Sequence, residues 1–333
     1  MRALSLFSGI GGLDLAAHAV GIETVAFCEI EPFAVQVLER RWPGVPIIDD
    51  VRKIRGCDWT VDVVHGGFPC QDLSVAGKQA GLEGERSGLW FEMLRVVSEL
   101  RPAFVLAENV RGAVNLALDT VCSGLGDEGY EVWPFVIPAS AFGAPHQRER
   151  LFVVGCRSDV AHAINERLQG SEWGCPLSEP EEAPYEPAPK CGEGYGSLWP
   201  TPSTMDNIER KGMRPSRAAT GRKTGYLSES VTGQLNPLWV ECLMGYPLGW
   251  TDVDCDEPEP WPGWPALMGE SQYPYEPPRT VTGCPNRAKR LKCLGNAVVP
   301  AQAYPFFEAI AIMEEVIRCN TKSSTSKAGA TRR

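Results

Sequence analysis

Short apolar runs alternate with amphipathic segments over the first half of the chain. The runs at residues 3–7, 24–28, 61–65, 103–107, 132–137 and 151–155 predict strands, and residues 13–20, 32–41, 89–100 and 112–127 predict helices. Strands that alternate with helices are typical of βαβ units around a mainly parallel sheet. We therefore expect an α/β fold with helices on both faces of the sheet.

This pattern ends near Gly155. Residues 178–189 are rich in Glu and Pro, and residues 191–202 add Gly and Trp-Pro pairs, which predicts a smaller, loop-rich lobe. An apolar helical pattern returns at residues 303–317, and the small, polar and basic end predicts a disordered tail. We expect a Rossmann-like domain at residues 1–155, a lobe at 156–235, the rest of that lobe with a returning C-terminal segment at 236–319, and the tail at 320–333.

The composition is that of an ordinary globular protein. The 333 residues are 43% apolar and 22% charged, and no apolar run approaches the roughly 20 residues of a membrane span. The first residues lead directly into a Gly-rich turn, so they predict a strand and not a secretory signal. The 12 cysteines form no CxxC pair and the chain has 4 histidines, so we expect reduced thiols, no metal site and a cytoplasmic protein.

Basic residues are concentrated although the net charge is −10. A negative total disfavours a nucleic-acid partner, because phosphate binding depends on Lys and Arg. However, residues 205–225 contain Arg210, Lys211, Arg214, Arg217, Arg222 and Lys223, and a second run contains Arg279, Arg287, Lys289, Arg290 and Lys292. Each run is consistent with a solvated face or with a phosphate-binding surface.

A Gly-rich turn joins the first strand to the first helix and suggests a cofactor site. The third glycine of the dinucleotide fingerprint would fall at Asp14, which weakens an NAD interpretation. Glu29 ends the next strand, where a Rossmann acid binds ribose hydroxyls, and Asp50 could hold an adenine amino group. A nucleoside ligand without a diphosphate, such as S-adenosylmethionine, fits these features; a Gly-rich turn with solvated acids is the alternative.

Chemically versatile side chains stand at the ends of three strand-like runs. Cys70 follows the first of them in the turn Gly66-Gly67-Phe68-Pro69-Cys70-Gln71, Glu108 follows another, and Arg148 and Arg150 precede a third. Open α/β sheets keep their chemistry at the carboxyl ends of strands, so Cys70 is the leading candidate nucleophile. Taken singly, Cys70 could be a buried hydrophobe, Glu108 a helix cap and the arginines a surface pair.

Taken together, these segments resemble the DNA (cytosine-5) methyltransferase family. The likeness covers residues 3–155 and returns near 241–247 and 294–310, through Phe-x-Gly-x-Gly, Gly-Phe-Pro-Cys-Gln, Glu-Asn-Val, Arg-x-Arg and Gly-Asn-x-Val-x-Pro. The resemblance implies that Cys70, Glu108, Arg148 and Arg150 are catalytic. It also implies an S-adenosylmethionine site formed by Phe7, Gly9, Gly11, Glu29, Ile30, Asp50, Val51, Phe68, Leu89, Asn296 and Val298.

The resemblance further implies a mechanism and partners. Cys70 would add to C6 of a cytosine flipped out of double-stranded DNA, and S-adenosylhomocysteine would be the product. The loop at residues 71–88 would close over the base, with the lobe as the target-recognition part; DNA contacts are expected from Gln71, Ser74, Lys78, Arg210, Lys211, Arg214, Arg217 and Arg222. We expect a monomer in a prokaryotic or phage-infected cell, with a cognate restriction endonuclease as a candidate partner.

Two alternatives keep the fold. The substrate could be RNA, because some transfer-RNA cytosine methyltransferases share it, or the chain could be a catalytically silent DNA-binding regulator. The sequence also departs from the family where His146 replaces a common glutamine, and where residues 250–294 form a longer stretch than expected.

Overall fold

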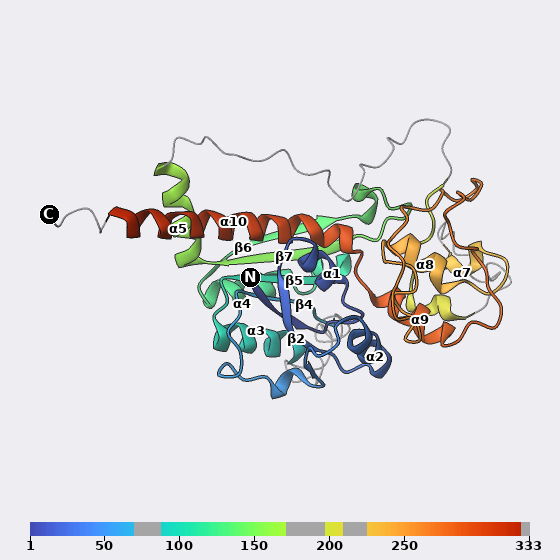
Figure 1. Cartoon of the computed structure of the whole chain (residues 1–333), viewed down its shortest axis with the longest axis horizontal. Coiled ribbons are helices and arrows are strands. Elements are labelled where there is room, and N and C mark those ends of the chain that lie inside the picture. The colour runs from blue at the N-terminus through green and yellow to red at the C-terminus, as the bar shows by residue number, and fades with distance from the viewer. Residues whose placement is uncertain (70–87, 171–196, 209–224, 328–333) are drawn as a thin grey trace.

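Seven strands form a sheet in the order β3-β2-β1-β4-β5-β7-β6 in this computed structural model (Figure 1). The structure describes residues 1–69, 88–170, 197–208 and 225–327. The strands are β1 (Arg2–Leu6), β2 (Glu23–Cys28), β3 (Ile47–Ile48), β4 (Val63–Gly67), β5 (Phe104–Val110), β6 (Tyr130–Ile137) and β7 (Arg150–Arg157). β1 to β5 pair in parallel, whereas β7 runs antiparallel to both β5 and β6. The predicted Rossmann-like, mainly parallel α/β fold is therefore confirmed.

Helices connect the strands and build the second lobe. They are α1 (Gly12–Ala19), α2 (Pro32–Arg41), α3 (Gly88–Leu100), α4 (Leu118–Asp127), α5 (Ser158–Gly170), α7 (Leu227–Ser230), α8 (Pro237–Met244), α9 (Arg287–Asn296) and α10 (Pro300–Lys327). Short 3-10 turns are η1 (Val51–Lys53), η2 (Arg111–Asn115), η3 (Ala139–Phe142) and η4 (Thr204–Asn207). None of these helices combines the length and the hydropathy needed to cross a membrane.

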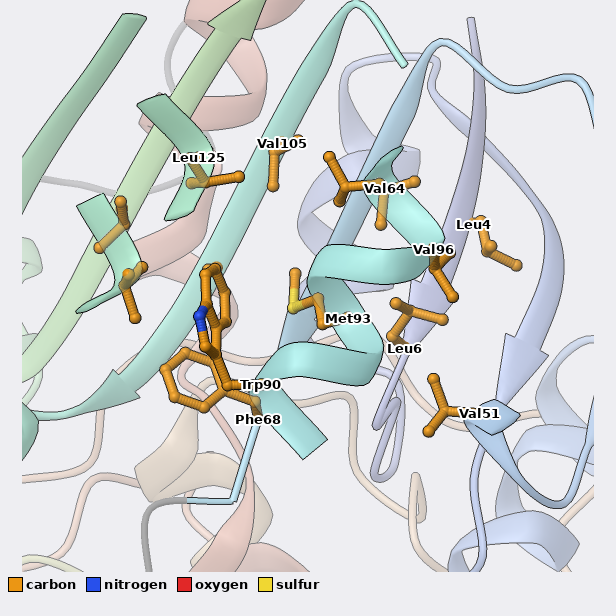
Figure 2. Close-up of a cluster of buried hydrophobic side chains, with 14 of the residues drawn as sticks. Leu4, Leu6, Val51, Val64, Phe68, Trp90, Met93, Val96, Val105 and Leu125 are labelled. Carbon is orange, nitrogen blue, oxygen red and sulfur yellow. The ribbon is translucent and has the colours of Figure 1, made fainter. Parts of the chain in front are cut away.

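The sheet is covered on both faces, as its apolar strands require. On one face, α3 and α4 bury a cluster that includes Val64, Phe68, Trp90 and Met93 (Figure 2). On the other face, α1, α5 and α10 pack over Phe104, Phe152 and their neighbours (Figure 1). The Gly-rich turn after β1 lies next to the second lobe (residues 197–208 and 225–296), because its Ile10 packs among buried side chains of that lobe.

The second lobe has its own core, which extends into the sheet domain. Trp239, Leu243 and Tyr246 from the α8 region and Leu294 from α9 pack together with α2 and with Ile10 of the Gly-rich turn. Inside this lobe, buried Arg290 forms ion pairs with Glu241 at 3.0 Å and Asp252 at 2.8 Å. The second basic run is thus partly internal and is not simply a solvated face.

The structure differs from the sequence-based elements in several places. The helix expected at residues 112–127 is divided into η2 and α4, since Gly112 and Asn115 are weak helix formers that suit a tight turn. Strand β3 and the helices α5, α7, α8 and α9 were not expected. Finally, α10 continues from Pro300 to Lys327, so part of the segment predicted as a disordered tail is helical.

Candidate active site

Most of the predicted cofactor and catalytic residues that the structure describes lie at one edge of the sheet. β1 pairs with β2 on one side and with β4 on the other, so the chain changes direction across the sheet between β1 and β4. Such a switch point, at the carboxyl ends of parallel strands, is the usual ligand position in an open α/β sheet. Eight of the expected cofactor residues follow β1, β2, β3 and β4, whereas Leu89 lies in α3 and Asn296 and Val298 lie at and after the end of α9. Glu108 lies near the end of β5, and Arg148 and Arg150 lie just before and at the start of β7.

Glu108 and Arg150 form the central ion pair of this edge. Arg150 Nε lies 2.8 Å from Glu108 Oε1, and each side chain is only 12% exposed. The antiparallel register explains the contact, because Glu108 lies opposite Phe152 and Arg150 opposite Val110, which places both side chains on the same face. Burial raises the pKa of Glu108, and the attraction of Arg150 and Arg148 opposes this shift without cancelling it. Burial at this site therefore favours the protonated form of Glu108 more than water does.

Gly67 brings the end of β4 against this carboxyl group. Gly67 pairs with Glu108 in the parallel register, and a Cβ added at Gly67 would lie 2.7 Å from Glu108 Oε2. Only glycine leaves room for the acid at this point. Cys70, three residues further along the chain, lies outside the described residues, so its position relative to Glu108 stays a prediction.

Asn109 fixes the same turn from β5 and was missed by the sequence analysis as a site residue. Its side-chain amide donates a 3.0 Å hydrogen bond to the Phe68 carbonyl and its Oδ1 accepts one from Val110 N. Asn109 is buried, so this bond is shielded from water. The signal was present in the Glu-Asn-Val triplet, but no pattern shows which backbone group an asparagine will reach.

Arg148 does not share the position of Arg150. Its backbone has a positive φ of 35°, which bends the chain before β7. Its buried guanidinium donates to the carbonyl oxygens of Pro202, Gly295 and Ala297. Arg148 therefore ties the second lobe and the segment after α9 to the sheet. Its charge also opposes the rise in the pKa of Glu108 that burial causes, and its catalytic role stays a prediction.

His146 is fully buried and lies two residues before Arg148. Its Nε2 lies 2.9 Å from the Leu243 carbonyl, which requires Nε2 to be the protonated nitrogen. Burial and the nearby Arg148 charge lower the pKa of His146 to about 3. The imidazole is thus neutral at physiological pH and, like the glutamine of many family members, can donate a hydrogen bond here.

The Gly-rich turn and Glu29 form a cradle that suits a nucleoside. Gly9 has a φ of 57°, and no atom lies within 4 Å of the position its Cβ would take. Glu29 accepts hydrogen bonds from the amides of Gly9, Ile30 and Glu31 and so locks the turn to the end of β2. Ile30 is 76% exposed beside it, an unusual position for a large apolar side chain and one that an adenine ring could cover.

The other expected cofactor residues differ in burial and in their hydrogen-bond partners. Phe7 has a φ of 51° in the same turn, Gly11 precedes α1, and Asn296 is exposed at the end of α9. Asp50 caps η1 and pairs with Arg52, whose hydrogen bonds lower the pKa of Asp50. The buried side chains are Val51, Val298 and Phe68, the last packed on Trp90 with ring centroids 5.1 Å apart, and Leu89 lies against the same cluster (Figure 2).

The expected DNA contacts cannot be compared with the structure. Gln71, Ser74, Lys78, Arg210, Lys211, Arg214, Arg217 and Arg222 all lie outside the described residues. Within the part of the chain that the structure describes, no group of three or more His, Cys, Asp or Glu side chains is arranged to hold a metal ion.

The Rossmann-like sheet and the Gly-rich turn after β1 fit the class of S-adenosylmethionine-dependent methyltransferases. The family model described as C-5 cytosine-specific DNA methylase matches residues 1–182 of the 333-residue chain. The chain therefore belongs to this family.

Curated relatives agree with this assignment. The chain is 32% identical over 270 residues to the type II methyltransferase M2.BsuMI of Bacillus subtilis (strain 168), covering 76% of this chain and 67% of the relative. It is 36% identical over 216 residues to M.Eco47II of Escherichia coli, covering 62% of this chain and 50% of the relative. The chain thus spans between half and two thirds of the length of these relatives.

Solved structures support the fold. A mutant of DNMT2 from Spodoptera frugiperda aligns with a TM-score of 0.55 at 16% identity, over 92% of this chain and 98% of that one. The Entamoeba histolytica methyltransferase EhMeth aligns with a TM-score of 0.55 at 14% identity, over 95% of this chain and 97% of that one. At this identity the likeness establishes the architecture alone.

Proposed function

We propose that this protein transfers a methyl group from S-adenosylmethionine to C5 of a cytosine in double-stranded DNA. The observation that carries the proposal is the partly buried Glu108–Arg150 pair, which lies against Gly67 three residues before Cys70. Family membership supplies the substrate class, and the curated relatives are named type II methyltransferases.

Cytosine C5 is too weak a nucleophile to react unaided, so the enzyme must raise its electron density. In the proposed mechanism, the Cys70 thiolate adds to C6 and the C5–C6 π electrons become available at C5. Glu108 donates a proton or hydrogen bond at N3, which offsets the charge that develops on the ring. After methylation, a base removes the C5 proton, the electrons re-form the C5–C6 double bond, and the Cys70 sulfur leaves.

The environment of Glu108 supports its role as the acid. Its pKa is raised by burial, so a larger fraction is protonated than for an exposed glutamate. Arg150 orients the carboxyl group at 2.8 Å and remains a donor for the cytosine carbonyl oxygen or for a phosphate. A target base must leave the duplex to reach these groups.

The cradle around Gly9 would hold the methyl donor. Bound S-adenosylmethionine would supply an electrophilic sulfonium methyl group. Glu29 is placed to accept ribose hydroxyls, Ile30 to cover the adenine, and the open space at Gly9 to admit the ligand close to the backbone. These residues would therefore bind and orient S-adenosylmethionine. Because this cofactor carries no pyrophosphate, the site needs no pyrophosphate-binding feature.

The polymer and partner assignments belong to the same proposal. Duplex DNA would be held between the sheet edge and the second lobe, with the basic residues between 205 and 225 as phosphate contacts. The resemblance to type II methyltransferases suggests a cognate restriction endonuclease and a cytoplasmic setting. A monomer is sufficient for the chemistry proposed.

Methyl transfer from labelled S-adenosylmethionine to duplex DNA tests the function directly. We expect label in 5-methylcytosine, no turnover for Cys70→Ser, and retained turnover for Cys57→Ser, which removes an exposed thiol elsewhere. DNA containing 5-fluorocytosine should trap a covalent adduct at Cys70, and bisulfite sequencing would give the target sequence. Label on cytosine N4 or adenine N6 would contradict the mechanism, and preferential labelling of transfer RNA would replace the DNA substrate.

A further inference from the structure

Two side chains of the second lobe, Trp250 and Tyr246, contact the Gly-rich turn and the segment after α9. Neither side chain takes part in the proposed chemistry. Trp250 Nε1 donates a 2.9 Å hydrogen bond to the carbonyl of Ile10, between Gly9 and Gly11. Tyr246 Oη donates a 2.8 Å hydrogen bond to the carbonyl of Val298, after α9. Both acceptors are backbone groups that border the proposed cofactor cradle.

Tyr246 packs so closely on the start of α1 that only glycine fits at position 12. Tyr246 is fully buried, and a Cβ added at Gly12 would collide with Tyr246 Oη and lie 2.9 Å from the Val298 oxygen. Gly12 is the first residue of α1. The phenol therefore joins the start of α1 to the segment that returns from the second lobe.

Trp250 is held rigidly from the lobe side. Its neighbours Gly249 and Thr251 donate their amides to the two carboxylate oxygens of Glu241, at 2.7 and 2.9 Å, and Arg290 pairs with the same carboxylate. This network is buried, so its hydrogen bonds are shielded from competing water. The indole is consequently fixed in position before any ligand binds.

The sheet domain clamps the same segment from the opposite side. Arg41 of α2 donates to the carbonyls of Gly249, Trp250, Asp252 and Cys255, and its guanidinium lies 5.5 Å from the centroid of the Trp250 ring. Trp42 packs edge-on against Trp250 with ring centroids 5.4 Å apart and fills the space beside Gly11. The Gly-rich turn therefore packs against the rings of Trp42 and Trp250, and Trp250 belongs to the second lobe.

From this geometry we infer that Tyr246 and Trp250 are positioning residues that set the conformation of the cofactor turn and so couple cofactor affinity to the second lobe. The inference rests on the proposed function, because it concerns the same cofactor site. Coupling of this kind is reciprocal, so a bound cofactor stabilises the lobe as the lobe stabilises the turn.

Titration with S-adenosylhomocysteine by calorimetry, without DNA, tests the coupling. Tyr246→Phe and Trp250→Phe each remove one hydrogen bond and retain an aromatic ring, so each should raise the Kd about 3- to 10-fold, the worth of one neutral hydrogen bond. In methyl-transfer assays, KM for S-adenosylmethionine should rise in the same proportion while kcat at saturating cofactor is unchanged. Hydrogen exchange at residues 8–12 should be faster in both variants.

Trp261→Phe is the matched control. Trp261 Nε1 donates to the Cys242 carbonyl at 3.0 Å, so this variant loses an indole hydrogen bond whose acceptor is within the lobe. Its S-adenosylhomocysteine affinity should match that of the wild type even if its stability falls. If Tyr246→Phe and Trp250→Phe also bind as the wild type does, the inference is wrong and the proposed function can still stand. If the wild type binds no S-adenosylhomocysteine, the proposed function fails and the inference fails with it.

Discussion

Arg150 Nε and Glu108 Oε1 lie 2.8 Å apart in a partly buried pair, and the carboxyl group nevertheless keeps a raised pKa. Burial outweighs the attraction of the two nearby arginines. In the proposed mechanism, Arg150 orients the carboxyl group and Glu108 supplies the proton. These are the two requirements of a general acid that must meet an incoming base in a fixed position.

Replacing the acid should remove its proton while preserving its shape. Glu108→Gln is expected to lower kcat by about 10²- to 10⁴-fold, the range that a positioned acid contributes. Single-turnover methyl transfer on duplex DNA measures this effect, and DNA affinity should change little. Glu149→Gln is the control, because Glu149 pairs with exposed Arg111 at 2.7 Å and takes no part in the proposed chemistry. An unchanged kcat for Glu108→Gln would remove Glu108 from the mechanism.

Gly67→Ala should disturb the site by displacing the acid. The added methyl group would lie 2.7 Å from Glu108 Oε2, so the carboxyl group must move relative to the Cys70 turn. A displacement of about 1 Å at reacting groups can cost about 10²-fold in rate, and we expect kcat to fall by about this factor. Gly112→Ala is the control, since no atom lies within 4 Å of the position of its Cβ. Equal activities of the two variants would show that the close approach is unimportant.

The strand pattern predicted the centre of the sheet well because β1, β4, β5 and β7 are mostly buried and read as continuous apolar runs. The same runs placed Glu108 and Arg150 at one sheet edge. Sequence could not reveal the bend at Arg148, because a positive φ at a non-glycine residue leaves no compositional signal. Helix α9 was missed for a related reason: its basic residues suggest a solvent-facing charge run, whereas Arg290 is buried by its pairing with Glu241.

Arg148→Lys tests whether Arg148 is a structural tie. An ammonium group cannot reach the carbonyl oxygens of Pro202, Gly295 and Ala297 together, so buried acceptors lose their donor. We expect the free energy of unfolding in urea to fall by about 3 kcal/mol, the worth of one or two hydrogen bonds to a charged group. Arg157→Lys, at the exposed end of β7 beside Asp159, should cost at most about 1 kcal/mol. Comparable losses in the two variants would contradict a special role for Arg148.

The neutral imidazole of His146 predicts a specific dependence of stability on pH. Its folded-state pKa is lowered to about 3, while an unfolded histidine titrates near 6.5, so the unfolded chain binds the proton first as the pH falls. Stability should therefore decrease below about pH 6.5 and continue to decrease toward pH 3, with this residue contributing a loss of about 2 kcal/mol between pH 7 and pH 5.

His146→Gln keeps a donor for the Leu243 carbonyl and removes the titration, so its urea unfolding should lack this part of the acid sensitivity. His162→Gln, on the exposed face of α5, controls for the loss of an imidazole elsewhere. Parallel pH profiles for the wild type and His146→Gln would show that folding does not lower the pKa of His146.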